Sequence, residues 1–135
     1  MEEAIALAER SVAKDSTNAE DLLWLGQLLD RAGKGDRAGE VLQRAAEAAP
    51  DRSDVILALF AHQVAANRRQ AAEGTLEKAA ALMTEPQKQL ALGQGYEMLG
   101  RIEDAEAAFR DAVKVASDDL ETHRALASFL VRCGK

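Results

Sequence analysis

The sequence contains a single cysteine, Cys133. No disulfide can therefore form within the chain, and cysteines cannot assemble a zinc cluster. The two histidines, His62 and His123, are the other soft metal ligands, and neither stands at zinc-ligand spacing from Cys133 or from the other. We therefore predict packing or surface roles for all three residues, and no metal ion or other cofactor.

Aromatic residues make up only 4% of the sequence, and the two prolines are Pro50 and Pro86. A core cannot be built from large rings, so it must come from close contacts between helices. Alanine, the best intrinsic helix former, is abundant, whereas strand-forming residues are sparse. Both prolines stand where a helix is expected to begin or end. The composition therefore predicts an all-α protein.

Basic residues are outnumbered, with 17 lysines and arginines against 23 aspartates and glutamates, and the formal charge is −6. Such a surface repels a phosphate backbone, so neither nucleic acid nor an anionic membrane is an expected partner. No apolar run approaches the roughly 18 residues of a membrane-spanning helix, and the acidic start does not fit a secretory signal. We favour a cytoplasmic location, and the alanine content suggests a bacterial source.

Arrangements that would support catalysis are also missing. No glycine-rich loop follows a strand, and no serine has a convincing histidine and acid around it. Paired carboxylates occur where helices are expected to begin, and there they complement the positive end of the helix dipole. These pairs are Glu2-Glu3, Glu103-Asp104 and Asp118-Asp119. We therefore predict that the chain is not an enzyme.

Apolar residues recur at spacings of three and four along the whole chain, which predicts successive amphipathic helices. Their approximate ranges are 2–14, 18–33, 37–49, 53–66, 69–83, 86–99, 102–116 and 120–134. Thr17 with Glu20, and Thr84 with Gln87, have the spacing of capping boxes. Left-handed caps at helix ends are expected at Gly33, Asn67 and Gly100.

An internal repeat is visible in the spacing of small residues. Ala38, Ala72 and Ala105 are 34 and 33 residues apart, and Gly26 precedes Gly93 by 67. Two helices in every 34 residues resembles the tetratricopeptide repeat (TPR) family. The first full repeat matches the family pattern at Leu22, Leu25, Gly26, Leu29, Ala38, Leu42, Ala45 and Pro50. The third matches it at Leu92, Gly93, Tyr96, Ala105, Phe109 and Ala112, with Gln89 and Ser117 as departures.

The resemblance implies a right-handed α-solenoid of antiparallel helix pairs, about eight helices in a single domain over 1–135. Full repeats are expected at 19–52, 53–85 and 86–119, with half repeats at 1–18 and 120–135. Two half repeats placed end to end would compose a whole one. We therefore predict that the chain is a fragment of a longer array, and that copies can stack head to tail.

The small residues at Gly26, Gly93, Ala45 and Ala112 are expected to let helices of neighbouring units approach closely. The middle repeat departs from this pattern, because Phe60 stands where a small residue belongs. One interpretation is a rotated helix that turns Leu57, Phe60, Ala61 and Val64 inward, and the other is a locally wider groove. The sequence does not decide between them.

In the family, the first helix of each repeat lines a concave groove that receives peptides or partner helices. That resemblance places the groove at Leu23, Trp24, Gln27, Arg31, Leu57, Ala61, Leu90, Gln94 and Met98. The expected function is a non-catalytic protein–protein interaction scaffold that binds a peptide or helix there. The basic residues of the carboxylate clamp found in chaperone-binding members are absent, so recognition of a C-terminal carboxylate in that manner is not expected.

Three alternatives remain open at this point. Leu23 and Trp24 could pack under a neighbouring repeat instead of contacting a ligand. The chain could also be a regulatory or substrate-docking segment of a larger enzyme. Finally, it could be a self-assembly or spacer module.

Overall fold

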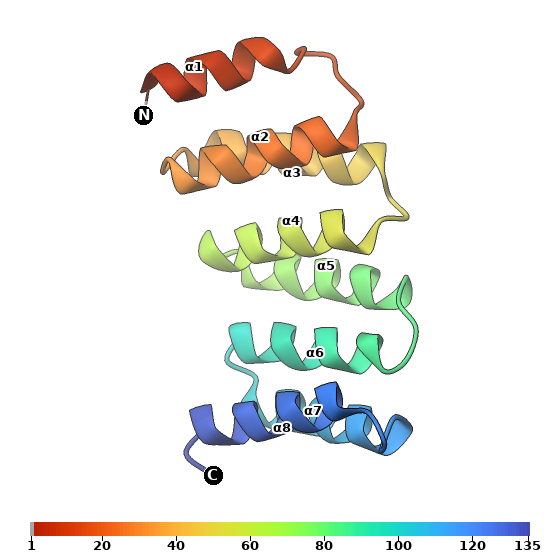
Figure 1. The fold of residues 1–135 in the computed structure, drawn as a ribbon. Coiled ribbons are helices and arrows are strands. Elements are labelled where there is room, and N and C mark those ends of the chain that lie inside the picture. The colour runs from red at the N-terminus through yellow and green to blue at the C-terminus, as the bar shows by residue number, and fades with distance from the viewer. Residues whose placement is uncertain (1) are drawn as a thin grey trace. The chain divides into compact units, whose positions relative to one another are not determined.

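The computed structural model describes residues 2–135, and every regular element in that range is an α-helix (Figure 1). The helices are α1 (Glu2–Ser11), α2 (Ala19–Arg31), α3 (Gly35–Ala48), α4 (Ser53–Ala65), α5 (Arg69–Ala81), α6 (Gln87–Met98), α7 (Ile102–Val115) and α8 (Leu120–Arg132). All eight predicted helices are confirmed, with ends that differ by a few residues.

The first helix ends earlier than its apolar pattern predicts. Ser11 donates a hydrogen bond from Oγ to the carbonyl oxygen of Leu7 at 2.8 Å, and α1 stops at that residue. The following loop is held by Arg44 of α3, whose guanidinium donates to the carbonyl oxygens of Lys14 at 2.6 Å and Ser16 at 3.1 Å. A loop fixed in this way satisfies backbone groups that a helix would otherwise pair.

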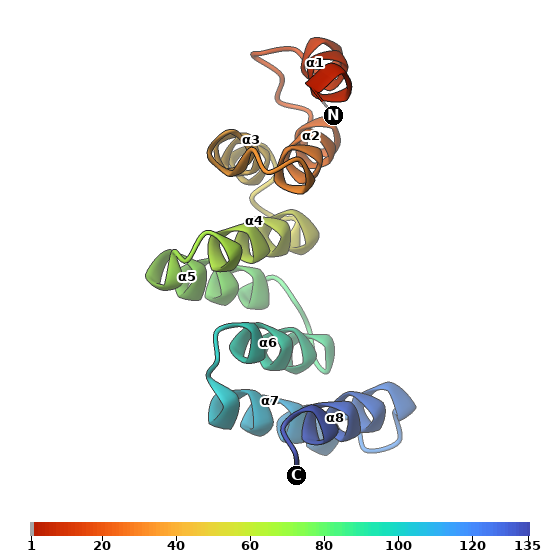
Figure 2. The same cartoon turned by 90° about the vertical axis from the view of Figure 1, so that its left-hand side faces the viewer.

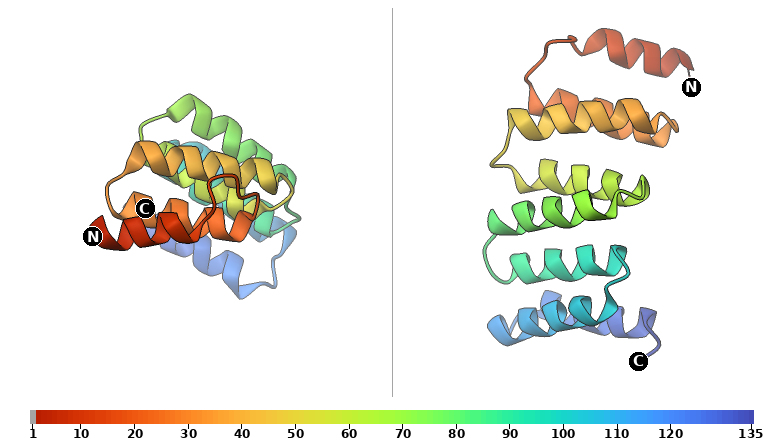
Figure 3. Two further views of the ribbon diagram at one scale, coloured as in Figure 1. Left: turned by 90° about the horizontal axis from the view of Figure 1, so that it is seen from above. Right: turned by 180° about the vertical axis from the view of Figure 1, so that it is seen from behind.

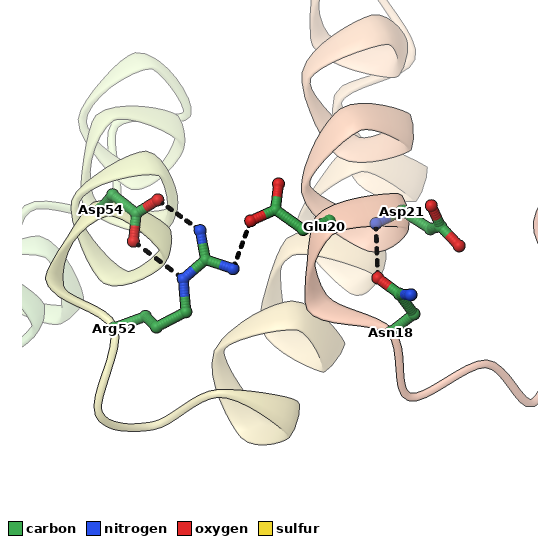
Figure 4. Close-up of polar contacts among 5 residues, drawn as sticks. All are labelled: Asn18, Glu20, Asp21, Arg52 and Asp54. Atoms are coloured by element: carbon green, nitrogen blue, oxygen red, sulfur yellow. Dashed lines mark hydrogen bonds and ion pairs between the residues drawn. The ribbon is translucent and has the colours of Figure 1, made fainter.

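Neither predicted capping box forms. At α2 the cap is Asn18, whose Oδ1 accepts from the backbone N–H of Asp21 at 3.1 Å, as Figure 4 shows. Glu20 is therefore free of the cap and instead pairs with Arg52 at 2.5 Å. At α6 the cap position is held by Pro86, which provides no side-chain hydrogen bond.

The three predicted left-handed caps are confirmed. Gly33 and Gly100 both have φ of 76°, and Asn67 has φ of 60°. Asn67 is the only residue other than glycine with a positive φ in the described range, and asparagine tolerates that region better than most residues.

The chain divides into two compact units, Met1–Thr75 and Leu76–Lys135, with the boundary inside α5. In the first unit, α2 and α3 lie side by side in all views (Figures 1, 2 and 3), and α4 packs on α3. The core of this unit draws on α1, α2, α3 and α4. Its buried members are Ile5, Ala8, Val12, Leu22, Leu25, Leu29, Ala38, Val41, Ala45 and Val55.

The second unit has its own core, in which α7 packs against both α6 and α8. Two aromatic rings form its centre: the centroids of Phe109 and Phe129 are 5.1 Å apart, and their planes are inclined by 38°. Leu90, Ala105 and Ala112 complete the buried cluster. With so few aromatics in the sequence, placing two of them together supplies much of the apolar area that this unit buries.

The small residues Gly26 and Gly93 do allow close approach, but within a repeat and not between neighbouring units. A Cβ atom on Gly26 would lie 2.6 Å from the side chain of Leu42, in the next helix. A Cβ atom on Gly93 would lie 2.8 Å from the ring of Phe109, again in the next helix. Each glycine therefore receives the large side chain of its own pair.

Helix α4 follows neither interpretation of Phe60 in full. Phe60 is buried with 2% exposure, together with Val55, Ile56 and Leu59. Ala61 is exposed, however, and Leu57 and Val64 are half-buried. The helix turns most of its bulky side chains inward and leaves Ala61 on the surface.

Candidate functional site

A cavity of about 590 Å³, here called the first cavity, opens between α2, α3 and α4 of the first unit. Alanines form its α4 wall at spacings of three and four residues, so their methyl groups line one helix face. Leu42, the side chain that covers Gly26, contributes from α3. The complete lining is Gln27, Asp30, Arg31, Leu42, Ala58, Ala61, His62 and Ala65. Small side chains on one wall leave room for a side chain from outside.

A hydrogen-bonded pair, Asp30 and His62, contributes to the lining. His62 Nδ1 lies 2.8 Å from Asp30 Oδ1 and 3.0 Å from Oδ2. Since a carboxylate can only accept, Nδ1 carries the proton and donates it. The His62 side chain is 7% exposed and that of Asp30 is 35% exposed. His62 therefore has the packing role predicted for it, and it also borders the cavity.

Two polar side chains of the lining have free hydrogen-bonding capacity. Gln27 and Arg31 are exposed, and neither has a hydrogen bond or ion pair to another residue in the range 2–135. Both side chains stand at the rim of the alanine-lined first cavity. The amide of Gln27 can donate and accept hydrogen bonds, and the guanidinium of Arg31 has five donors. Such an arrangement suits a ligand with one apolar group and several polar ones.

A second cavity, of about 300 Å³, occurs in the other unit between α6, α7 and α8. It is lined by Gln94, Phe109, Glu121, Arg124, Ala125, Ser128 and Arg132. Five of these residues follow their counterparts in the first cavity by 67 positions, the length of two repeats. The counterpart pairs are Gln27 and Gln94, Leu42 and Phe109, Ala58 and Ala125, Ala61 and Ser128, and Ala65 and Arg132. Equivalent repeat positions therefore line both cavities, with the residue type kept in the pairs Gln27 and Gln94, and Ala58 and Ala125.

Three of these five pairs differ in residue type, and one of the three changes adds a charge. Where the first has Ala65, the second has Arg132, which donates two hydrogen bonds of 2.8 Å to the carboxylate of Glu97. These bonds lower the pKa of Glu97 and raise that of Arg132. Glu97 is the counterpart of Asp30, so the acid is kept in both units and its partner changes.

The residues predicted from sequence are distributed over several environments. Gln27, Arg31 and Ala61 line the first cavity, and Gln94 lines the second. Trp24 and Met98 are 47% and 50% exposed but line neither. Leu23 and Leu57 are half-buried, and Leu23 packs against the first core.

Leu90 is a correction to the predicted site. It is 7% exposed and belongs to the second core beside Phe109, so it offers little surface to a ligand. Conversely, the apolar and polar stripes of the sequence do not single out Asp30, Leu42 and Ala65. Asp30 could have been found, because it stands three residues after Gln27 on the same helix face.

Metal ligation and membrane insertion have no support in the part of the chain that the structure describes. Among residues 2–135, no group of three or more His, Cys, Asp or Glu is arranged to hold a metal ion. The helices of this range are also too short or too polar to cross a membrane.

Comparison with known families gives two matches. A family model described as "Anaphase-promoting complex, cyclosome, subunit 3" matches residues 1–79, more than half of the chain. A model described as "Tetratricopeptide repeat" matches residues 86–129. No curated protein has significant sequence similarity to the chain.

Several solved structures share the fold. MamA MSR-1 is 28% identical over 98% of this chain and 77% of its own, with a TM-score of 0.63. MamA from Desulfovibrio magneticus RS-1 is 21% identical, with 98% and 76% coverage and a TM-score of 0.64. TTC0263, a thermophilic TPR protein of Thermus thermophilus, is 24% identical, with 95% and 72% coverage and a TM-score of 0.72. The last two are similar in fold alone.

Proposed function

The chain belongs to the tetratricopeptide repeat family, and from that premise we propose that it is a non-catalytic scaffold that binds a peptide or helix of a protein partner. The proposed contact places an apolar side chain of the partner in the first cavity. Gln27 and Arg31 at the rim then bind polar groups of the same segment. The coarser part, an all-α TPR-type interaction scaffold, follows from the family itself.

The recurrence of the cavity carries this proposal. Positions 67 residues apart keep an amide and a large apolar residue, so the repeat presents a hollow with these two features in both units. Helix α4 is also well supplied with bulky residues, yet it presents Ala58, Ala61 and Ala65 here. The net charge of −6 further supports a protein partner over nucleic acid.

Filling the first cavity tests the proposal. Peptides are first selected from a displayed random library on the immobilised chain, and their affinity is then measured by fluorescence of Trp24, the single tryptophan. Ala61→Leu should weaken the selected peptides about tenfold or more, because a leucine in the lining takes the volume that a partner side chain needs.

Ala6→Leu is the matched control, because Ala6 is an exposed alanine of α1 outside the cavity. It adds the same side chain and should leave the affinity unchanged. Circular dichroism of both variants establishes that their helices are intact. Undiminished affinity in Ala61→Leu would remove the first cavity from the binding site.

A further inference from the structure

The first unit contains another hollow, here called the polar cavity, of about 550 Å³ between α3 and α4. It is lined by Gly35, Asp36, Gly39, Glu40, Gln43, Leu59, His62, Gln63, Ala66 and Arg68. His62 is the one residue that it shares with the first cavity, so the imidazole ring borders both. Most of its lining residues are polar or charged, and they come from both helices.

Two acceptors of this lining, one of them a buried atom, have no donor among the described residues. Gln63 Oε1 is buried and has no hydrogen-bond partner in the part of the chain that the structure describes. His62 donates a hydrogen bond from Nδ1 to Asp30, so Nε2 is the acceptor in the neutral tautomer, and no residue in the range 2–135 donates to it. A buried acceptor without a donor is costly, and native proteins leave few of them unsatisfied.

Gly39 lets the ring of His62 approach the backbone of α3 closely. A Cβ atom on Gly39 would lie 2.9 Å from His62 Nε2, too close for any side chain to stand there without displacing the ring. Glycine is otherwise unfavourable inside a helix by comparison with alanine. Its presence in α3 therefore accommodates the imidazole ring at the border of the polar cavity.

The charges around these acceptors are predominantly negative. Asp36 and Glu40 line the cavity from α3, and neither has an ion-pair partner within residues 2–135. Arg68 is the single cation of the lining, so carboxylates outnumber it. A metal ion is not the complement, since no suitable ligand group occurs in the described chain. The complement is an organic cation with several N–H donors in one plane.

We propose that the polar cavity binds the guanidinium group of an arginine side chain presented by a protein partner. Glu40 and Asp36 supply negative charge and accept some of the N–H donors of the guanidinium. His62 Nε2 and Gln63 Oε1 accept the remaining N–H donors. A guanidinium has five donors in a fixed fork, which matches several acceptors around one hollow better than a lysine ammonium does. This site is separate from the first cavity and does not depend on the function proposed for it.

The probe is the peptide acetyl-Gly-Arg-Gly-amide, titrated into the full ¹⁵N-labelled chain. We expect saturable shifts of the Gly35 and Gly39 amides and of the Gln63 side-chain amide, with a dissociation constant on the order of 1 mM for a single side chain. The same peptide with citrulline, which is neutral and otherwise similar in shape, should cause no saturable shift at these groups. Equal responses to the two peptides would overturn the proposal.

Matched variants separate the site from general electrostatics. Glu40→Gln should weaken the arginine peptide about tenfold, whereas Asp51→Asn, which removes the same charge from an exposed position outside the cavity, should change it less than about twofold. Gln63→Leu should also weaken binding, without lowering the thermal midpoint, because it removes an unsatisfied acceptor. If Glu40→Gln and Asp51→Asn have the same effect, the polar cavity does not hold the guanidinium.

Discussion

Two glycines decide how closely the helices of a pair can approach. Gly26 receives Leu42 and Gly93 receives Phe109, and in both cases a Cβ atom would overlap the incoming side chain. Gly74 in α5 is different, because a Cβ atom there would meet nothing within 4 Å. All three residues are glycines, but only Gly26 and Gly93 stand where a Cβ atom has no room.

Gly93→Ala should destabilise the protein by about 1–3 kcal/mol, because Phe109 must move to admit the methyl group. Gly74→Ala should stabilise it by up to about 1 kcal/mol, the difference in helix propensity between the two residues. Urea denaturation followed by circular dichroism measures both. A Gly93→Ala variant as stable as the parent would mean that Gly93 does not set the approach of α6 and α7.

The sequence identifies some residues of the candidate site and misses others for one physical reason. Periodicity places Gln27, Arg31, Ala61 and Gln94 on a stripe beside the packing stripe, and they do line the cavities. Leu90 has the same periodicity but is buried, because adjacent helix positions are only about 100° apart and tertiary packing decides which stripe turns inward. The Asp30 and His62 pair joins residues of different helices, which no local pattern encodes.

At the scale of elements, charged side chains connect the helices of successive pairs. Arg52, before α4, pairs with Glu20 of α2 at 2.5 Å and with Asp54 at 2.6 Å, as Figure 4 shows. Its hydrogen bonds lower the pKa of Asp54. In the second unit Arg132 of α8 makes a bidentate bridge to Glu97 of α6. Ion pairs at exposed sites contribute only modestly to the free energy of folding. Their main effect is to fix the geometry of the segments that they join.

The Glu97 bridge should make the second unit sensitive to acid. Its hydrogen bonds from Arg132 lower the folded-state pKa of Glu97 below the ordinary 4.5. A lowered pKa stabilises the fold above the ordinary value, and that stability is lost as the pH falls through the lowered one. Glu97→Gln should therefore reduce the thermal midpoint by a few degrees at pH 7, and the difference from the parent should disappear in acid.

Thermal melts of both proteins from pH 7 to about pH 3 measure this effect, which must be separated from the titration of other carboxylates. Glu77→Gln is the control, since Glu77 is an exposed glutamate inside α5, away from its first turn, without an ion-pair partner in residues 2–135. A difference between parent and Glu97→Gln that persists unchanged in acid would show that the bridge is not its source.

Helix positions are easier to predict than helix ends. Apolar spacing alone locates all eight helices, because that pattern reflects burial of one face along the whole element. The predicted caps at α2 and α6 are wrong. At α2, Thr17 and Asn18 are both acceptable caps, and the sequence does not show which of them adopts the extended backbone.

For the whole molecule, the terminal helices expose positions that inner helices bury. Leu7 of α1 is 59% exposed, whereas its repeat counterparts Val41 and Ala108 are 9% and 5% exposed. Ala127 of α8 is exposed, whereas its counterparts Gly26 and Gly93 are buried. The assignment of 1–18 and 120–135 as half repeats remains a prediction, and these exposures support it.

We therefore expect head-to-tail association, in which α8 of one copy contacts α1 of another. The weight-average mass from sedimentation equilibrium should rise with protein concentration, and Leu7→Glu should abolish the rise by placing a charge in the contact. Leu82→Glu, at another exposed leucine of 42% exposure, should not. A mass that stays monomeric at every concentration contradicts the stacking.

One imidazole ring separates two hollows of different chemistry. Because His62 borders both the first cavity and the polar cavity, any displacement of the ring by an occupant on one side changes the space and the acceptor available on the other. Such coupling is reciprocal by thermodynamic necessity: the factor by which an arginine alters the affinity for an apolar anchor equals the factor by which the anchor alters the affinity for arginine. A partner that presents both an apolar anchor and an arginine would therefore bind the two cavities as coupled sites. The total free energy of binding would be the same whichever group binds first.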